Sequence, residues 1–110
     1  MASLGTIIFK GKSGKEYTFN IYNLDSSWDE IAVVYVVTRA EPKPNGGNTH
    51  QVIYIGETDN LKERFSNHHK QSCFDKNKAN RLCTFHVIDN ETRLAIESDL
   101  IGSHDTPCND

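Results

Sequence analysis

The sequence predicts an α+β fold in which a small central antiparallel β-sheet is flanked by helices. Two observations predict it. Most β-branched and aromatic runs come early in the chain, and capped helical segments come later, with one further apolar run between them. The chain has 110 residues and 36% of them are hydrophobic, which is enough for one core. We therefore expect one domain.

Residues 1–30 are expected to extend that domain by an N-terminal β-hairpin. Residues 6–9 and 17–22 are β-branched and aromatic, and residues 12–15 between them have the composition of a turn. The polar connection that follows contains Trp28, which should pack onto the sheet.

Two apolar runs predict the centre of the sheet. Residues 31–37 are apolar at odd and even positions alike, which is typical of a strand buried on both faces. Residues 52–56 form a second run of this kind. We expect both to be central strands, paired antiparallel across a loop at residues 39–50.

The helices are predicted from their capping residues. Asn60 with Glu63 three positions later resembles a capping box, so a helix should run from about residue 61 to 70. Residues 73–81 are compatible with a short helix, and residues 82–88 indicate a third core strand. Asp89 and Asn90 should cap a last helix over about residues 91–103.

Charge is distributed unevenly along the chain. The net charge of −3 argues against a purely electrostatic nucleic-acid binder. Residues 62–81, however, carry six Lys or Arg against two Asp or Glu. This stretch is either a local phosphate-binding face or a solvated helix with its following loop, and charge runs more often have the second role.

The sequence shows no sign of a membrane segment or a disulfide framework. No run approaches the ~18 apolar residues of a spanning helix, and the N-terminus lacks the features of a signal peptide. Three widely spaced cysteines without a CxxC pair favour a reducing, cytoplasmic location. The candidate zinc ligands lack the short spacing of ligand pairs; they are Cys73, Cys83, His86, His104 and Cys108.

Glu97 is the candidate metal ligand. Leu94, Leu100 and Ile101 define an apolar stripe on the last predicted helix, and Glu97 points along it. A buried carboxylate should be paired, protonated or bound to a cation. The alternative is that Glu97 lies at the edge of the stripe and reaches solvent.

Further candidates lie on the earlier segments. Arg64 and His68 stand at i and i+4, so one helical face should present both, either to an anion such as phosphate or simply to solvent. Tyr35 and Tyr54 lie in the apolar strands, where a buried phenol needs a hydrogen-bond partner.

Taken in order, these residues resemble the GIY-YIG nuclease superfamily over about residues 31–110. The second half of that motif is intact as Tyr54-Ile55-Gly56, and the first half, Val33-Val34-Tyr35, keeps only its tyrosine. Arg64 and His68 follow at the spacing of the arginine helix. A later helix carries Glu97, and Asn109 stands near the end of the chain.

The resemblance implies an endonuclease that uses Mg²⁺ or Mn²⁺ to hydrolyse phosphodiester bonds, with DNA as the expected partner. Arg64 would hold the scissile phosphate and Glu97 would bind the metal ion. Tyr35 would activate the attacking water, with Tyr54 and His68 hydrogen-bonded around it, and the two tyrosines could exchange roles. Gly56 and Asn109 would position the site, Asn109 by holding the final segment against it.

The sequence also departs from the family pattern. Val33 replaces the glycine of the first half-motif. Glu57 follows Gly56, where its carboxylate could repel phosphate or help hold a cation. The rival hypothesis is a non-catalytic module that binds nucleic acid or protein on the same fold. The sequence does not distinguish DNA from RNA, and it does not predict an oligomeric state.

Overall fold

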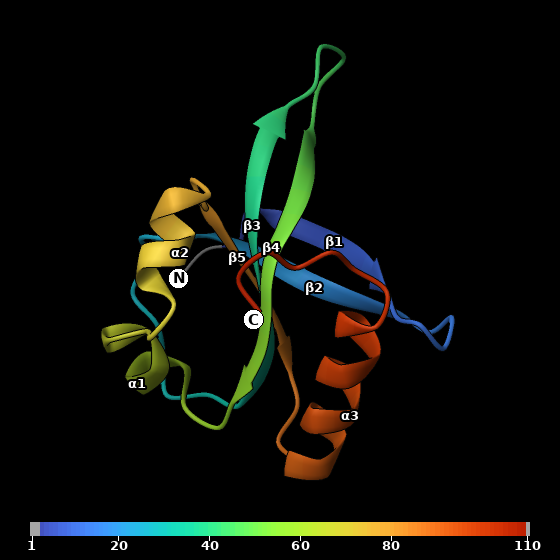
Figure 1. The fold of residues 1–110 in the computed structure, drawn as a ribbon, viewed down its shortest axis with the longest axis vertical. Coiled ribbons are helices and arrows are strands. Elements are labelled where there is room, and N and C mark those ends of the chain that lie inside the picture. Colours follow the sequence, from blue (N-terminus) through green and yellow to red (C-terminus); the bar gives the residue numbers. More distant parts are fainter. Residues whose placement is uncertain (1–2, 110) are drawn as a thin grey trace.

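Five antiparallel strands form one sheet in the order β1-β2-β5-β3-β4 in the computed structural model, which describes residues 3–109 (Figure 1). The α+β fold with an added N-terminal hairpin is confirmed. In chain order the elements are β1 Gly5–Lys10, β2 Glu16–Asn23, β3 Val33–Pro42, β4 Asn48–Thr58, α1 Leu61–Ser66, α2 Gln71–Lys76, β5 Arg81–His86 and α3 Asn90–Ile101. No helix of the described chain is long and apolar enough to cross a membrane.

Strand β3 lies between β5 and β4 and is buried on both faces, as its uniformly apolar sequence predicts. Alternate side chains of β3 supply two cores. One core, under α1 and α2, contains Val33, Tyr35 and Val37, and the other, under α3, contains Val34 and Val36. The helices therefore cover opposite faces of one sheet.

The prediction that β4 is a central strand is wrong, because β4 is the edge of the sheet. Its outer side is covered by the C-terminal segment, in which the Cys108 N–H donates to the Ile53 carbonyl at 3.0 Å and Asn109 bonds to the backbone of Ile55. The register shifts between Val37 and Thr38, which leaves Ile53 as the extra residue of a bulge. The apolar sequence of β4 is explained by the helices that cover both faces of the sheet and by the C-terminal segment that covers its edge.

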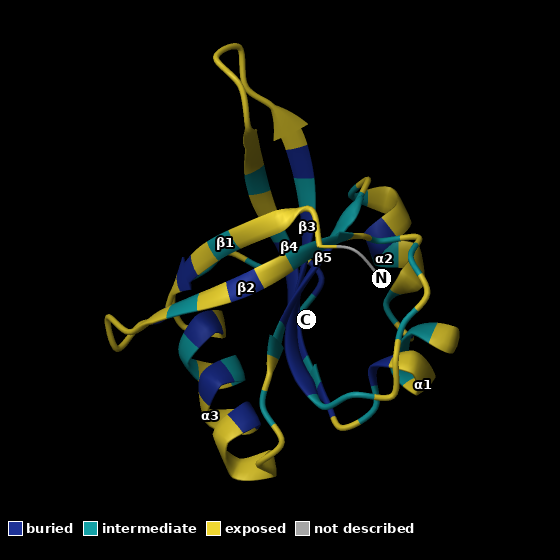
Figure 2. Cartoon of the chain, turned by 180° about the vertical axis from the view of Figure 1, so that it is seen from behind, coloured by how far each residue is buried: buried dark blue, intermediate teal, exposed yellow. Residues whose placement is uncertain are grey.

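The prediction of a loop over residues 39–50 is also wrong. Strand β3 continues to Pro42 and β4 begins at Asn48, so only residues 43–47 form the turn. The two strands project beyond the core as a ribbon (Figure 1), and its tip is exposed on both sides (Figure 2). A ribbon with two solvated faces needs no apolar alternation, which is why periodicity does not predict it.

The helices begin where the capping residues predict. The side chain of Asn60 accepts a hydrogen bond from the Glu63 N–H, and that of Asp89 accepts one from the Thr92 N–H. Helix α1 is shorter than expected, because it ends at Ser66 rather than near residue 70.

The expectation that the chain lacks a disulfide is wrong. Cys73 of α2 and Cys108 of the C-terminal segment are bonded to each other. A separation of 35 residues gives no sequence signal for this pairing, which depends on the tail folding back along β4. The two sulfurs are therefore not available as zinc ligands. Cys83 is a free, buried thiol whose pKa burial raises to about 12.

We predict that reducing the Cys73–Cys108 bond lowers the free energy of unfolding by about 3–4 kcal/mol. The bond closes a loop of 35 residues, and its reduction returns that loop's entropy to the unfolded chain. Urea unfolding with and without dithiothreitol measures the difference. A Cys73→Ser/Cys108→Ser double variant should be insensitive to the reductant, and equal stability of the parent in both buffers would contradict the prediction.

Candidate active site

Two tyrosines and a glycine form the floor of the candidate site. Tyr35 on β3 and Tyr54 on β4 face α1 and α2, with ring centroids 6.0 Å apart. Gly56 pairs with Tyr35 in the register of the two strands. A Cβ atom at Gly56 would lie 2.6 Å from Cζ and the hydroxyl of Tyr35 and 2.9 Å from Cε2 of Tyr54. Only glycine leaves room for both phenols at this point.

His68 is the buried partner of Tyr35. Its Nε2 lies 2.8 Å from the Tyr35 hydroxyl, while its Nδ1 accepts a hydrogen bond from the Lys70 N–H at 3.1 Å. Burial, followed by the charges of His69, Arg64 and Lys70, lowers the pKa of His68 to about 4. At neutral pH the ring is therefore uncharged, its proton is on Nε2, and it donates to the Tyr35 oxygen.

The expectation that Arg64 and His68 share one helical face is wrong. Helix α1 ends at Ser66, and His68 lies in the segment that connects α1 to α2. The connection turns the imidazole inward, where it packs against Phe65 and Phe74 at centroid distances of 4.9 and 4.8 Å. Residues beyond a helix lose its periodicity, so the i, i+4 argument does not apply to them.

We predict that stability falls as the pH is lowered from about 6.5 toward 4 because of His68. Its folded pKa of about 4 lies below the ordinary unfolded value, so the unfolded chain binds the extra proton in this window and unfolding becomes easier. The loss should reach about 2 kcal/mol at pH 5. Urea unfolding at several pH values measures it.

The control for this prediction uses a second histidine. His68→Gln should flatten the pH dependence, whereas His86→Gln, at an exposed position of β5, should keep the slope of the parent. An unchanged slope in His68→Gln would show that another group causes the acid sensitivity.

Arg64 is the cation of the site. Its guanidinium is close enough to lower the pKa values of Tyr35, Tyr54, His68 and Glu97. The side chain is half-buried, and a cavity of about 230 Å³ opens beside it. Arg64 is therefore the positive charge that acts on the phenols, the imidazole and a carboxylate.

The two phenols differ in acidity. Burial raises the pKa of Tyr35 far above its usual range, and Tyr54 raises it further. Burial also raises the pKa of Tyr54, but there the hydrogen bond with Tyr35 lowers it. Tyr35 is 0% exposed, whereas Tyr54 is 9% exposed. Of the two, the pKa of Tyr54 is raised less, and Tyr54 is the less deeply buried.

Glu97 lies on the edge of the buried stripe of α3, not within it. The predicted stripe is wrong in phase, because Leu94 and Ile101 are 46% and 37% exposed, while Ile96 and Leu100 are buried. The pKa of the Glu97 carboxyl is raised by burial and then by the Glu57 carboxylate, and Arg64 lowers it. Glu97 also raises the pKa of Tyr54, so its carboxylate acts electrostatically on that phenol although α3 covers the opposite face of the sheet.

Arg93 is a residue of the site that the sequence argument missed. It is 4% exposed, and its Nε donates to the Glu57 carboxylate at 3.0 Å. Its Nη1 donates to the carbonyls of Val87 and Ile88 at 3.1 and 2.7 Å. Arg93, Ile96 and Leu100 are spaced so that they share one face of a helix. A charged residue argues against burial of that face unless its ion-pair partner is known, so the sequence did not identify it.

Asn109 joins the C-terminal segment to the motif strand. Its Oδ1 accepts from the Ile55 N–H at 2.9 Å and its Nδ2 donates to the Ile55 carbonyl at 2.8 Å. Ile55 stands between Tyr54 and Gly56. The amide thus pairs with the open edge of β4 at the level of the phenols.

The family model described as "GIY-YIG catalytic domain" matches residues 15–109. The chain belongs to the GIY-YIG family. No curated protein and no solved structure matches the chain. The match begins in the β1–β2 turn and includes β2, whereas the sequence resemblance was limited to residues 31–110. The division of the domain at residue 30 stays a prediction.

Proposed function

We propose that this GIY-YIG protein is a divalent-metal-dependent endonuclease that hydrolyses phosphodiester bonds of DNA. The observation that carries the proposal is the electrostatic coupling of a small set of groups around the Tyr54 phenol of β4. They are the hydrogen-bonded Tyr35–His68 pair, the Tyr54 phenol, the Arg64 guanidinium and the Glu97 carboxyl. A cation, an acid–base group and a carboxylate are the groups that phosphodiester hydrolysis needs.

The residues fit Mg²⁺ or Mn²⁺ held through one carboxylate. No group of three or more His, Cys, Asp or Glu that could enclose a metal occurs within residues 3–109, so an all-protein cage is not available there. Mg²⁺ is commonly held by one or two carboxylates, with waters and substrate phosphates completing its shell. Burial and Glu57 raise the pKa of Glu97, which is the electrostatic setting that a bound cation relieves. When bound, the ion would stabilise negative charge on the reacting phosphate.

Glu57 is not free to compete with Glu97, because Arg93 holds it. The buried guanidinium of Arg93 compensates the charge of the Glu57 carboxylate. We propose that this pair lets a carboxylate follow the Tyr-Ile-Gly motif without repelling the substrate.

The two phenols and the imidazole would form the hydrogen-bonded group that accepts the proton of the attacking water. His68 Nε2–H donates to Tyr35, and Tyr35 in turn lowers the pKa of Tyr54 by hydrogen bonding. We propose that Tyr54, the less deeply buried of the two phenols, accepts the proton, and that Tyr35 transmits the hydrogen bond from His68. The charge of Arg64 favours the deprotonated phenol, since it lowers the pKa values of both tyrosines.

Arg64 would hold the scissile phosphate, and Asn109 would keep the motif strand in place. A planar guanidinium presents two donors to a phosphate and matches the charge that develops on it. The Asn109 amide fixes the backbone of Ile55, so it would act through the position of Tyr54 and Gly56 rather than by touching the substrate.

A cytoplasmic location remains a proposal. A nucleic-acid substrate supports it, whereas the Cys73–Cys108 bond counts against it, because disulfides are rare in reducing compartments. Thiol labelling of the protein in intact cells would show whether this bond is formed there.

Labelled nucleic acids incubated with Mg²⁺, Mn²⁺ or EDTA test the proposed activity. The panel should include single strands, duplexes and branched forms in both DNA and RNA. We expect cleavage of DNA with either metal ion and none in EDTA. Binding of the panel without metal-dependent cleavage would instead identify a non-catalytic module on this fold.

A further inference from the structure

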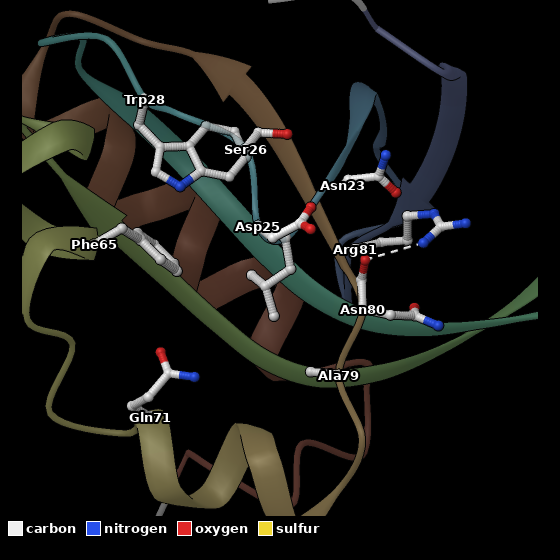
Figure 3. A pocket seen from close by; sticks show the side chains of 10 residues that line it. Asn23, Asp25, Ser26, Trp28, Phe65, Gln71, Ala79, Asn80 and Arg81 are labelled. Carbon is white, nitrogen blue, oxygen red and sulfur yellow. Dashed lines mark hydrogen bonds between the residues drawn. The ribbon is translucent and has the colours of Figure 1, made fainter.

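A second, larger cavity lies beside the candidate active site. Its volume is about 680 Å³, and it is open to solvent between the β2–β3 connection, α1, α2 and the start of β5. Figure 3 shows the rings of Trp28 and Phe65 on one side and Asn23 and Arg81 on the other. The cavity thus has an aromatic wall facing a polar one.

Phe65 connects this cavity to the candidate active site. Its ring centroid lies 6.1 Å from that of Trp28, 5.2 Å from that of Tyr35 and 4.9 Å from that of His68. Phe65 also follows Arg64 directly in the chain. The Phe65 side chain therefore lies between the cavity wall at Trp28 and the candidate active-site residues Tyr35 and His68.

The polar wall contains hydrogen-bonded Asn80 and Arg81 and carries both signs of charge. The side chain of Asn80 bonds to the N–H and the carbonyl of Ala40 at 2.7 and 3.1 Å. The Asn80 carbonyl accepts from Nη1 of Arg81 at 3.0 Å, which holds the guanidinium at the cavity (Figure 3). Asp25 adds a carboxylate. A carboxylate repels phosphate but accepts hydrogen bonds from the N–H groups of bases.

These features fit a nucleobase better than a phosphate group. Aromatic rings stack on bases of any kind, and side-chain amides, carboxylates and guanidinium groups hydrogen-bond to base edges. A base inside a duplex has both faces covered by its neighbours, so it cannot enter a concave site unless it leaves the stack.

We propose that this cavity holds one unpaired nucleobase stacked on Trp28, and that the substrate carries an unpaired nucleotide next to the cleaved bond. This inference rests on the proposed nuclease function. It narrows the substrate class to single strands, tails, flaps or bulges, and it gives Trp28, Asp25 and Arg81 a role in selecting the substrate.

The fluorescence of Trp28 provides a direct test, because it is the only tryptophan of the chain. The parent protein is titrated in EDTA with a single-stranded oligonucleotide, a blunt duplex of the same sequence, and that duplex with a single-stranded tail. Anisotropy of the labelled nucleic acid reports binding in the same samples. We expect quenching by the single strand and the tailed duplex but not by the blunt duplex. Binding of the single strand without quenching, or equal quenching by the blunt duplex, would overturn the proposal.

Two variants extend the test. Trp28→Leu should weaken binding of the tailed duplex by roughly 5- to 150-fold, the effect of losing one stacked base, and leave blunt-duplex binding unchanged. Arg81→Gln should also weaken binding of the tailed duplex but not of the blunt duplex. Unlike Trp28→Leu, this variant does not remove an aromatic ring from the core. Arg39→Gln removes the same charge from a partly exposed position of β3, where Arg39 pairs with Glu41, and serves as its control. Equal losses in Arg81→Gln and Arg39→Gln would contradict a role for Arg81.

The readouts separate the two proposals. Quenching without metal-dependent cleavage would support the nucleobase site and contradict the proposed nuclease activity. Cleavage without quenching would support the nuclease activity and contradict the nucleobase site.

Discussion

Glu97→Gln should abolish divalent-dependent cleavage and leave the fold intact. The substitution keeps the size and shape of the side chain but removes the charge that would bind the metal ion. Glu97 lies at the edge of the α3 stripe and is half-buried, so the amide can be accommodated without a cavity. Stability should stay the same or rise, because the half-buried carboxyl lies beside the Glu57 carboxylate, which raises its pKa.

Single-turnover cleavage across a range of Mg²⁺ concentrations measures this effect, with urea unfolding as the test of integrity. Glu91→Gln is the matched control, since Glu91 is exposed in the first turn of the same helix. It should cleave like the parent protein. If Glu97→Gln cleaves as fast as the parent at saturating Mg²⁺, Glu97 is not the metal ligand.

Local patterns predicted the elements that local physics controls. The apolar run at β3 indicated burial on both faces, and Asn60 and Asp89 marked helix starts through hydrogen bonds that span three residues. The β1–β2 turn followed from turn composition, and the antiparallel pairing of β3 with β4 followed as the simplest topology for two apolar strands joined by a loop. All of these features depend on neighbours in sequence.

Features that depend on distant segments were not predictable in this way. Strand β4 resembles a central strand because the C-terminal segment covers its edge, and no periodicity reports a tail that folds back. The Cys73–Cys108 pairing has the same origin. Arg93 was missed because its burial depends on Glu57, which lies 36 residues away in the chain.

The candidate site shows the same division. Tyr35, Tyr54 and Gly56 were identified from a motif on adjacent strands, and the close approach of the rings explains the glycine. His68 was identified for its spacing from Arg64 on a helix that in fact ends before it. Its contact with Tyr35 arises from the connection to α2, whose course only the structure shows.

Arg64→Ala should lower the cleavage rate by about 10²–10³, the loss typical of one preorganised electrostatic donor. Its guanidinium lowers the pKa values of Tyr35 and Tyr54, so the variant should also need a higher pH to reach its maximal rate. Arg64→Lys should restore only part of the rate, because an ammonium group cannot present two donors in one plane.

Affinity should fall far less than the rate in Arg64→Ala, and this difference distinguishes an enzyme from a binding module. One phosphate contact among several contributes little to ground-state binding, whereas transition-state stabilisation acts on the rate alone. Single-turnover cleavage and equilibrium binding, measured on the same substrate, give the two quantities. Lys62→Ala removes one exposed charge from the same helix and controls for the loss of general electrostatic attraction. Equal losses of rate and affinity in Arg64→Ala would mean that Arg64 anchors the strand and does not stabilise the transition state.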